Sequence, residues 1–348
     1  MKKLSLIVIL TLLVTLLAGC VATPVVICTC PTGGAAPTQP TNPFVPTEGA
    51  LKTGLAIVTN LRDSKNAEVA KFDVTLVAVL VDDNGVIADC VIDSIGVDIN
   101  FDATGTITSS LAEEVATKNE LGDSYNMVAY GGAKYEWYQQ ANALAQFAVG
   151  KTVEELKNGA VNESGYAPAG SDLASSATIY LGGYVSTIAE AVANAKHLGA
   201  QAGDELILAS RSNTIDSTSA SAEAAGTAQL NCDATALTVK DGKITSCYID
   251  AVQAKVSFDT TGTITSDISS GVKTKNQLGK DYNMVAWGGA KAEWNQQAAS
   301  FATYITGKTA AEVAGIAVTE GKPSEADLAA SVTISIADFQ KLIAKAMG

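Results

Sequence analysis

Apolar positions follow a strand-like pattern at the start of each half of the chain and a helix-like pattern towards its end. Short runs rich in Val, Ile, Leu and Thr, bounded by polar or glycine-containing segments, predict β-strands. The six predicted strands cover 55–59, 72–81, a segment ending at Asp93, 206–209, 229–239 and a segment ending at Asp250. Each half therefore begins with three strands.

Glycine-containing turns connect these predicted strands. Asp83-Asn84-Gly85 in the first half and Asp241-Gly242 in the second separate the second strand from the third. Glycine accepts the positive φ angle that a tight hairpin turn requires. We expect another short hairpin around Gly105 and around Gly262.

The period then changes to that of a helix. An apolar face with steps of three and four residues is formed by Trp137, Ala141, Leu144, Ala145 and Ala148. We expect this helix to begin at Gly131-Gly132 and to end at Gly150. A second helix follows, and Thr152 with Glu155, or Thr309 with Glu312, forms a capping box at its start. The last predicted helices cover 183–196 and 337–347.

Strands followed by helices predict an α+β fold, in which each repeat is an antiparallel sheet with helices packed on one face. The two halves are also copies of each other. "TKNELGDSYNMVAYGGAKYEWYQQA" begins at Thr117 and "TKNQLGKDYNMVAWGGAKAEWNQQA" begins at Thr274. About half of the positions in the central stretch are identical, which indicates a tandem duplication. We place domain 1 at 49–198 and domain 2 at 199–348.

The N-terminus has the features of an export signal. Lys2 and Lys3 precede an apolar segment, and 1–19 is predicted to be a signal peptide for the Sec pathway. Leu17-Ala18-Gly19-Cys20 resembles the lipobox of bacterial lipoproteins, which implies lipidation of Cys20 and attachment to the outer face of the cytoplasmic membrane. Pro, Gly and Thr dominate the segment that follows, so 20–48 is expected to be a flexible tether.

Composition excludes several functions. The formal net charge is -13, and an acidic surface repels phosphate backbones, so we expect no nucleic-acid partner. His197 is the single histidine, so a metal site with several histidine ligands is excluded within one chain. We expect no catalytic residue for hydrolysis, because no motif here activates a nucleophile. We also expect no metal site, and Cys28 and Cys30 in the tether fit incidental cysteines better than a pair that binds a metal or a redox partner. Asp93 with Asp102, and Asp250 with Asp259, are paired carboxylates in predicted strands or turns, and a turn carboxylate is expected to cap its own backbone.

Five cysteines remain beside Cys20, namely Cys28, Cys30, Cys90, Cys232 and Cys247. An odd number in an exported protein leaves at least one thiol free or paired with another molecule. Cys90 and Cys247 occupy equivalent strand positions. They fit either small buried residues or a bridge between the domains.

One phrase closes each half: "DLASSAT" at 172–178 and "DLAASVT" at 327–333. Together with the strand pair "ALTVKDGKITSCYID" and the final helix, it resembles the FMN-binding domain family. Many members carry FMN joined through its phosphate to the Thr of a motif Asp-x-x-Ser/Thr-Gly-Ala-Thr, placed there by a flavin transferase. The resemblance implies an antiparallel sheet with helices and bound FMN, covalent or non-covalent.

The motif is degenerate in both copies. In the first copy the resemblance assigns the cofactor-binding positions Asp172, Ser175, Ala177 and Thr178. Ser176 stands where the family has Gly. In the second copy Asp327 and Thr333 hold the ends, and 330–332 departs from the pattern. Gly allows close approach of the backbone to a phosphate, and Ser or a β-branched residue such as Val332 hinders it. Thr178, which is preceded by one departure rather than three, therefore fits the motif better than Thr333.

Two further features suit a flavin. Backbone N–H groups at a helix start bind phosphate, and the candidate starts follow Thr178, Thr333, Gly131-Gly132 and Gly288-Gly289, with Lys134 or Lys291 nearby. The glycine pairs also fit simple turns. Tyr130 and Trp287 precede the helices and are candidates for contact with the flavin ring, whereas Trp137 and Trp294 fit core packing.

Two functions follow. The first is an extracytoplasmic, membrane-anchored lipoprotein whose two FMN-binding-like domains bind flavin and exchange electrons with redox partner proteins at the cell surface. The second is a non-enzymatic binding or structural lipoprotein that has the fold without the cofactor. An electron carrier or binding protein fits the sequence better than an enzyme with its own substrate turnover.

Overall fold

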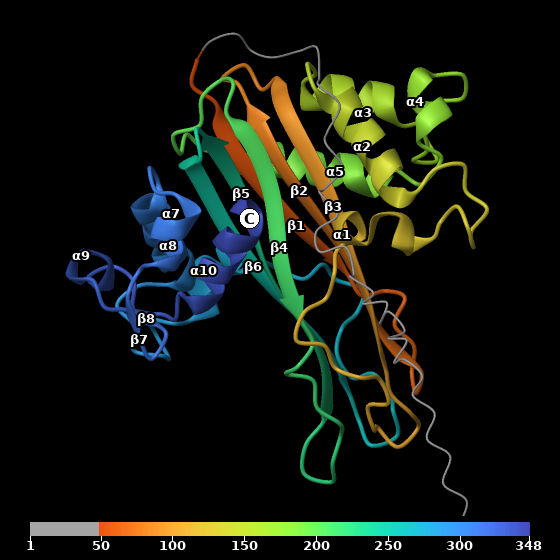
Figure 1. Ribbon diagram of the computed structural model, residues 1–348. Coiled ribbons are helices and arrows are strands. Elements are labelled where there is room, and N and C mark those ends of the chain that lie inside the picture. The colour runs from red at the N-terminus through yellow and green to blue at the C-terminus, as the bar shows by residue number, and fades with distance from the viewer. Residues whose placement is uncertain (1–48) are drawn as a thin grey trace, which may run out of the picture. The chain divides into compact units, whose positions relative to one another are not determined.

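A computed structural model describes residues 49–348, all within one compact unit (Figure 1). The predicted signal peptide, the lipidated Cys20, the tether, Cys28 and Cys30 lie outside the described residues. Within 49–348 no helix combines the length and the apolar character needed to cross a membrane.

The first repeat opens with a three-stranded antiparallel sheet in the order β1-β2-β3. Its strands are β1 (Lys52–Asn60), β2 (Val69–Val81) and β3 (Ile87–Asn100). In the second repeat β4 (Glu205–Asn213), β5 (Gly226–Lys240) and β6 (Lys243–Phe258) form a second sheet in the same order. Helices pack against both sheets, and the predicted α+β class is confirmed.

The third strand of each sheet is longer than the sequence pattern predicts. It does not end at Asp93 or Asp250 but continues to Asn100 in the first repeat and to Phe258 in the second, with Ile95 and Ile99 buried in the first repeat. The expected end was wrong because an acidic residue was interpreted as a turn residue. Asp93 instead keeps its carboxylate inside, where Oδ1 accepts hydrogen bonds from the N–H groups of Ser94 and Asn119.

The hairpin turns follow the prediction. Gly85 has φ +81°, while Asp241 and Gly242 have φ +52° and +73°. The two left-handed residues Asp241 and Gly242 suit a two-residue turn between twisted antiparallel strands, whereas the single left-handed Gly85 ends a longer loop in which its N–H donates to Asp82 O. The further short hairpins are present too, because Phe101 pairs with Ile107 and Phe258 with Ile264 across the turns that contain Gly105 and Gly262.

Helices complete each repeat. The first repeat contains α1 (Lys118–Leu121), the 3₁₀ helix η1 (Gly122–Tyr125), α2 (Trp137–Ala148), α3 (Val153–Ala160), α4 (Asp172–Ser176) and α5 (Gly182–Asn194). The second contains α6 (Lys275–Leu278), η2 (Gly279–Tyr282), α7 (Trp294–Ile305), α8 (Ala310–Ala314), the short hairpin β7 (Val318–Thr319) and β8 (Lys322–Pro323), α9 (Ala326–Ala329) and α10 (Ala337–Met347). The capping boxes predicted at Thr152 and Thr309 are both present.

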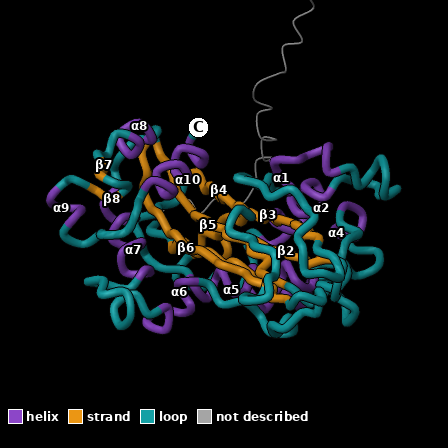
Figure 2. The backbone as a smooth tube through the Cα atoms, turned by 90° about the horizontal axis from the view of Figure 1, so that it is seen from below, coloured by secondary structure: helices purple, strands orange, loops and turns teal. Residues whose placement is uncertain are grey.

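Four layers result from this arrangement. One face of each sheet carries helices: α2 packs on β3 and α5 on β1 and β2, while α7 packs on β6 and α10 on β4 and β5. The opposite faces of the two sheets share one inner core, which contains Phe72 and Leu76 from the first repeat and Leu230 and Val256 from the second. Figure 2 shows the strands between α2 and α4 on one side and α7 to α10 on the other.

Contacts between the repeats are reciprocal, as in a symmetric dimer. The equivalent rings of Phe101 and Phe258 stack with centroids 4.1 Å apart and an interplanar angle of 5°. Ala67 N–H donates to Gly262 O and Ala220 N–H donates to Gly105 O, each at 2.7 Å. The two halves are therefore related by a pseudo-twofold axis close to the phenylalanine pair.

Candidate functional site

The phrase shared by the two copies forms a short helix followed by a turn. In the first copy Ser171 caps α4, because its Oγ accepts a hydrogen bond from Ala174 N–H. Ser175 and Ser176 donate their hydroxyl hydrogen bonds back to carbonyl oxygens of the same turn, including Asp172 O. These serine hydroxyls thus provide donors for carbonyl oxygens of α4 itself. The chain then extends through Ala177 to Thr178.

A buried glutamine holds the turn at Thr178. Gln140, on α2, is 0% exposed. Its Oε1 accepts hydrogen bonds from Thr178 N–H at 2.7 Å, from Thr178 Oγ1 at 3.1 Å and from Ile179 N–H at 3.1 Å. Its Nε2 donates to Tyr135 O at 2.9 Å. The Gln140 amide therefore fixes the turn at Thr178 to the N-terminal part of α2.

The second copy repeats this geometry. Gln297 is 1% exposed, and its Oε1 accepts from Thr333 N–H at 2.7 Å, from Thr333 Oγ1 at 3.2 Å and from Ile334 N–H at 3.2 Å. The middle of the phrase differs between the copies, whereas the Gln–Thr pair is the same. Sequence reasoning missed the two glutamines, and the signal available was one polar residue on the apolar face of each helix.

The threonine hydroxyl is not needed to hold the turn. A carbonyl oxygen has two lone pairs, and in the first copy both can be filled by the N–H groups of Thr178 and Ile179. Thr178 is an exposed residue, while Thr333 is half-buried. A substituent on Thr178 Oγ1 would therefore remove one hydrogen bond and leave no buried donor without a partner.

The structure brings together some of the predicted residues. Lys134 Nζ donates to Ser175 O at 3.2 Å, so the loop with the glycine pair lies against the phrase. Asp172 and Asp327 are exposed, and Ala177 is 1% exposed in the outer core between helices and sheet. Ala177 therefore serves packing, while the Asp172 carboxylate faces solvent.

The glycine pairs lie in a loop and do not begin a helix as predicted. α2 begins at Trp137 with Glu136 as its N-cap, and α7 begins at Trp294 with Glu293 as its N-cap. A Cβ on Gly131 would lie 2.6 Å from Met127 O, so this glycine allows a close backbone approach within the loop. Gly288 has the same relation to Met284 O at 2.8 Å. The interpretation as a turn is confirmed at both pairs.

A buried carboxylate shapes each of these loops. Glu136 is 6% exposed and accepts hydrogen bonds from Met127 N–H at 2.8 Å and Val128 N–H at 3.0 Å. Glu293 does the same for Met284 and Val285. The loops hold their aromatic residues out in solvent: Tyr130 and Trp287 are each 88% exposed.

The other candidates have structural roles. Trp137 and Trp294 are 3% and 6% exposed within the outer cores, so the expected core packing is confirmed. Asp102 Oδ1 accepts from Thr104 and Thr106 in its own turn, and these bonds hold its pKa below the usual value. Asp259 is bound in the same way by Thr261 and Thr263.

Asp93 and Asp250 are buried beneath α1 and α6. Desolvation raises the pKa of each from 3.8 to about 6, although hydrogen bonds from the Thr117 or Thr274 hydroxyl and from neighbouring N–H groups oppose the shift. Each carboxylate joins its third strand to the short helix that follows, since Oδ1 also accepts from Asn119 N–H or Asn276 N–H.

The cysteines of the described region are buried free thiols: Cys90, Cys232 and Cys247. Cys90 lies in the outer core of the first repeat and Cys247 in that of the second. The two sheets separate these cores, so a bridge between Cys90 and Cys247 does not form. Burial raises the pKa of both thiols, which suppresses the reactive thiolate.

Among residues 49–348 no cluster of three or more His, Cys, Asp or Glu side chains is arranged to hold a metal ion. Comparison of the chain with known protein families, with curated proteins and with solved structures finds no match in any of the three.

Proposed function

We propose that the chain is an extracytoplasmic lipoprotein, anchored through lipid on Cys20, that binds flavin for electron transfer at the cell surface. The observation that carries the proposal is the Thr178 turn. Thr178 is an exposed residue at the end of the motif, its hydroxyl donates to Gln140 Oε1, and Gln140 also holds the backbone through two N–H groups. A cofactor attached there would be presented to solvent from a rigid position.

The residues fit FMN in one respect and not in another. The Thr178 hydroxyl suits attachment of the flavin through its phosphate, and Lys134 beside Ser175 is a cation for that phosphate. The N–H groups of Thr178 and Ile179 are already bound to Gln140, so this turn offers no backbone cradle. When bound, FMN supplies the redox chemistry, and the chain's task is to hold and tune it.

Thr178 and Thr333 are not equivalent in this proposal. Thr178 is exposed, Thr333 is half-buried, and the two belong to opposite helical layers with both sheets between them. Each flavin would then exchange electrons with its own partner rather than directly with the other. We expect Thr178 to be the main site.

Absorption spectroscopy tests the proposal on the full chain, produced through its native export pathway together with a flavin transferase. The expected result is a yellow protein whose flavin fluorescence stays with the denatured chain. Thr178→Ala should remove most of this fluorescence, while the matched variant Thr333→Ala should remove little. A colourless protein that also fails to bind added FMN would sink the proposal.

A second candidate is a non-enzymatic binding lipoprotein, and the aromatic loops favour it. Tyr130 and Trp287 expose 88% of their surface on loops that Glu136 and Glu293 hold in the same shape. Exposed aromatic side chains on rigid supports are typical anchors of binding surfaces. The two loops would act as a matched pair of contact sites.

Photo-crosslinking in the producing cell tests this candidate. A photoreactive phenylalanine analogue replaces Tyr130 or Trp287 in turn, and the control carries it at Ile215, which is also exposed. A crosslinked product at 130 and 287 that is absent at 215 supports a binding role for the loops. Equal crosslinking at all three positions would count against it.

A further inference from the structure

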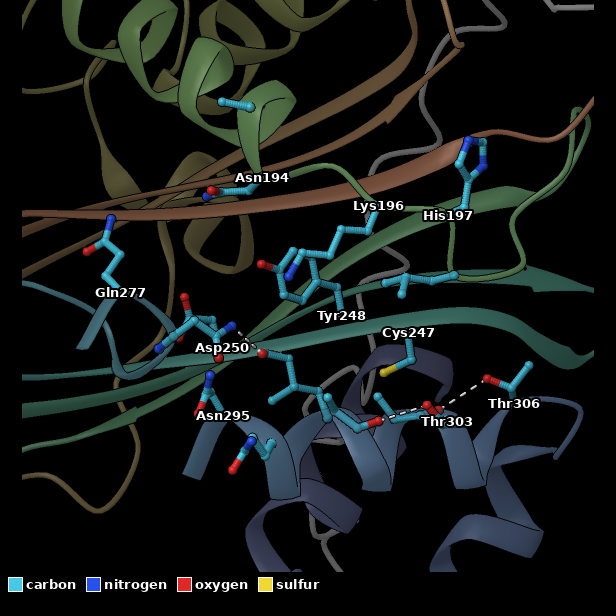
Figure 3. A pocket seen from close by; sticks show the side chains of 17 residues that line it. Asn194, Lys196, His197, Cys247, Tyr248, Asp250, Gln277, Asn295, Thr303 and Thr306 are labelled. Carbon is cyan, nitrogen blue, oxygen red and sulfur yellow. Dashed lines mark hydrogen bonds between the residues drawn. The ribbon is translucent and has the colours of Figure 1, made fainter. Parts of the chain in front are cut away.

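A cavity of about 940 Å³ lies where the end of the first repeat meets the helical layer of the second (Figure 3). Its walls come from the end of α5 and the linker on one side and from β6 and α7 on the other. The volume falls in the range that small-molecule sites occupy. It is separate from the Thr178 turn, which does not line it.

Shorter side chains on α7 open this cavity. Tyr138 and Gln146 on α2 are replaced by the shorter Asn295 and Thr303 on α7, while Val149, which follows α2, is replaced by Thr306, of similar size and more polar. On the floor, Tyr248 of β6 replaces Val91. The side chains that α7 turns to the cavity are therefore smaller than their equivalents on α2.

Amide side chains are frequent in the lining, which contains Asn194, Asn276, Gln277, Asn295 and Gln296. Asn194 Nδ2 donates to Leu55 O and Asn276 Nδ2 donates to Ile249 O, so one of the two N–H donors of each amide is bound to the backbone. Asn295 Oδ1 has almost no accessible surface and no partner among the described residues, so a ligand in the cavity reaches it only after the amide turns towards the cavity. A buried acceptor without a donor costs free energy, which a bound donor recovers.

The charges of the lining nearly cancel. Asp250 supplies a carboxyl group, and Lys196 Nζ supplies a cation that lies 5.0 Å from the Tyr248 ring centroid. His197 Nε2 lies 2.9 Å from Asp83 Oδ1, so the histidine is directed to a carboxylate outside the lining. Figure 3 shows Lys196 beside Tyr248 across the cavity from Asn295 and Thr303. A strongly charged ligand, whether anionic or cationic, would therefore lie near a group of its own charge in this cavity.

We propose that this cavity is a binding site for a neutral, hydroxyl-rich small molecule of the mono- or disaccharide class. In this proposal sugar hydroxyls would donate to the amide oxygens of Asn194 and Asn276, and to that of Asn295 once its amide turns towards the cavity. The same hydroxyls would accept from Lys196 Nζ. The site belongs to the fused chain, because α5 and the linker come from one repeat while β6 and α7 come from the other.

Ligand-observed NMR with the full chain tests the proposal, with glucose, N-acetylglucosamine and maltose as the probes at up to about 10 mM. Saturation transfer to at least one sugar is expected. Asn295→Tyr places the first-repeat residue in the cavity and should weaken that binding at least about tenfold. The matched exchange Tyr138→Asn in the first repeat should leave it unchanged.

If Asn295→Tyr does not fold, Thr303→Gln narrows the cavity in the same way and is expected to weaken binding too. Three results would overturn the proposal: no transfer to any of the sugars, equal binding in Asn295→Tyr, or preference for the polyamine spermidine over the sugars. Thr178→Ala is expected to leave sugar binding unchanged. The sugar proposal and the flavin proposal can therefore fail independently of each other.

Discussion

At the residue scale, Gln140 is the side chain on which the candidate site depends. Gln140→Leu removes the acceptor of Thr178 N–H and Ile179 N–H and the donor to Tyr135 O. We expect the free energy of unfolding to fall by roughly 2–4 kcal/mol, because buried polar groups lose their partners. Denaturant unfolding measures it. Gln146→Leu, on the exposed side of the same helix, should change it by less than about 0.5 kcal/mol.

Asp93 makes stability depend on pH. In the unfolded chain its carboxyl ionises near the ordinary pKa of 3.8, whereas burial raises the folded pKa to about 6. Between these values the folded state holds more protons, so the free energy of unfolding falls as pH rises from about 4 to 6. Asp93→Asn should flatten this decline by roughly 1–3 kcal/mol in urea titrations. An unchanged pH profile would contradict the assignment.

Residue roles were predictable where the interaction is local. The capping boxes at Thr152 and Thr309 and the turn carboxylates Asp102 and Asp259 depend on partners a few positions away, and the structure confirms them. Gln140 was not predictable, because its partner Thr178 lies 38 positions away and only the packing of α4 on α2 brings them together.

At the scale of elements, the loop before α2 depends on one carboxylate. Glu136→Ala removes the acceptor of Met127 N–H and Val128 N–H. Hydrogen exchange of these two amides should become at least about tenfold faster, since their opening no longer breaks a charge-assisted bond. Glu154→Ala, an exposed acidic position on α3, is the control and should leave both amides unchanged.

The order of elements follows from the pattern, but several ends do not. Periodicity located α2 correctly from Trp137 onward, while the predicted start at Gly131 failed because glycine pairs serve loops as well as helix starts. α4 and α9 were missed, because helices of five and four residues show too few turns to reveal a period.

At the scale of the molecule, the contact between repeats can be tested at one glycine. A Cβ on Gly105 would lie 2.5 Å from Asp259 O of the other repeat, and φ is +67°. Gly85 has φ +81° and nothing within 4 Å. Both alanine variants lose stability from the backbone, and Gly105→Ala should lose roughly 1–3 kcal/mol more. Equal midpoints in thermal unfolding would show that the contact contributes nothing.

The face-to-face packing of the two sheets was only partly predictable from the sequence. Continuous apolar runs such as 76–81 of β2 indicate a strand buried on both faces. Helices account for one face. The sheet of the second repeat covers the other face of the first sheet. The apolar pattern could not show this, because it tells that a face is buried and not which element buries it.

The stacked Phe101–Phe258 pair has a consequence for how this protein acquires new properties. In a symmetric dimer of separate chains, every substitution occurs on both sides of the axis at once. Here the two sides are encoded separately, so Tyr138 and Asn295 can differ at equivalent positions. Because the repeats are joined in one chain, the first repeat can keep the larger Tyr138 on its helix while the second carries the smaller Asn295 beside a polar cavity.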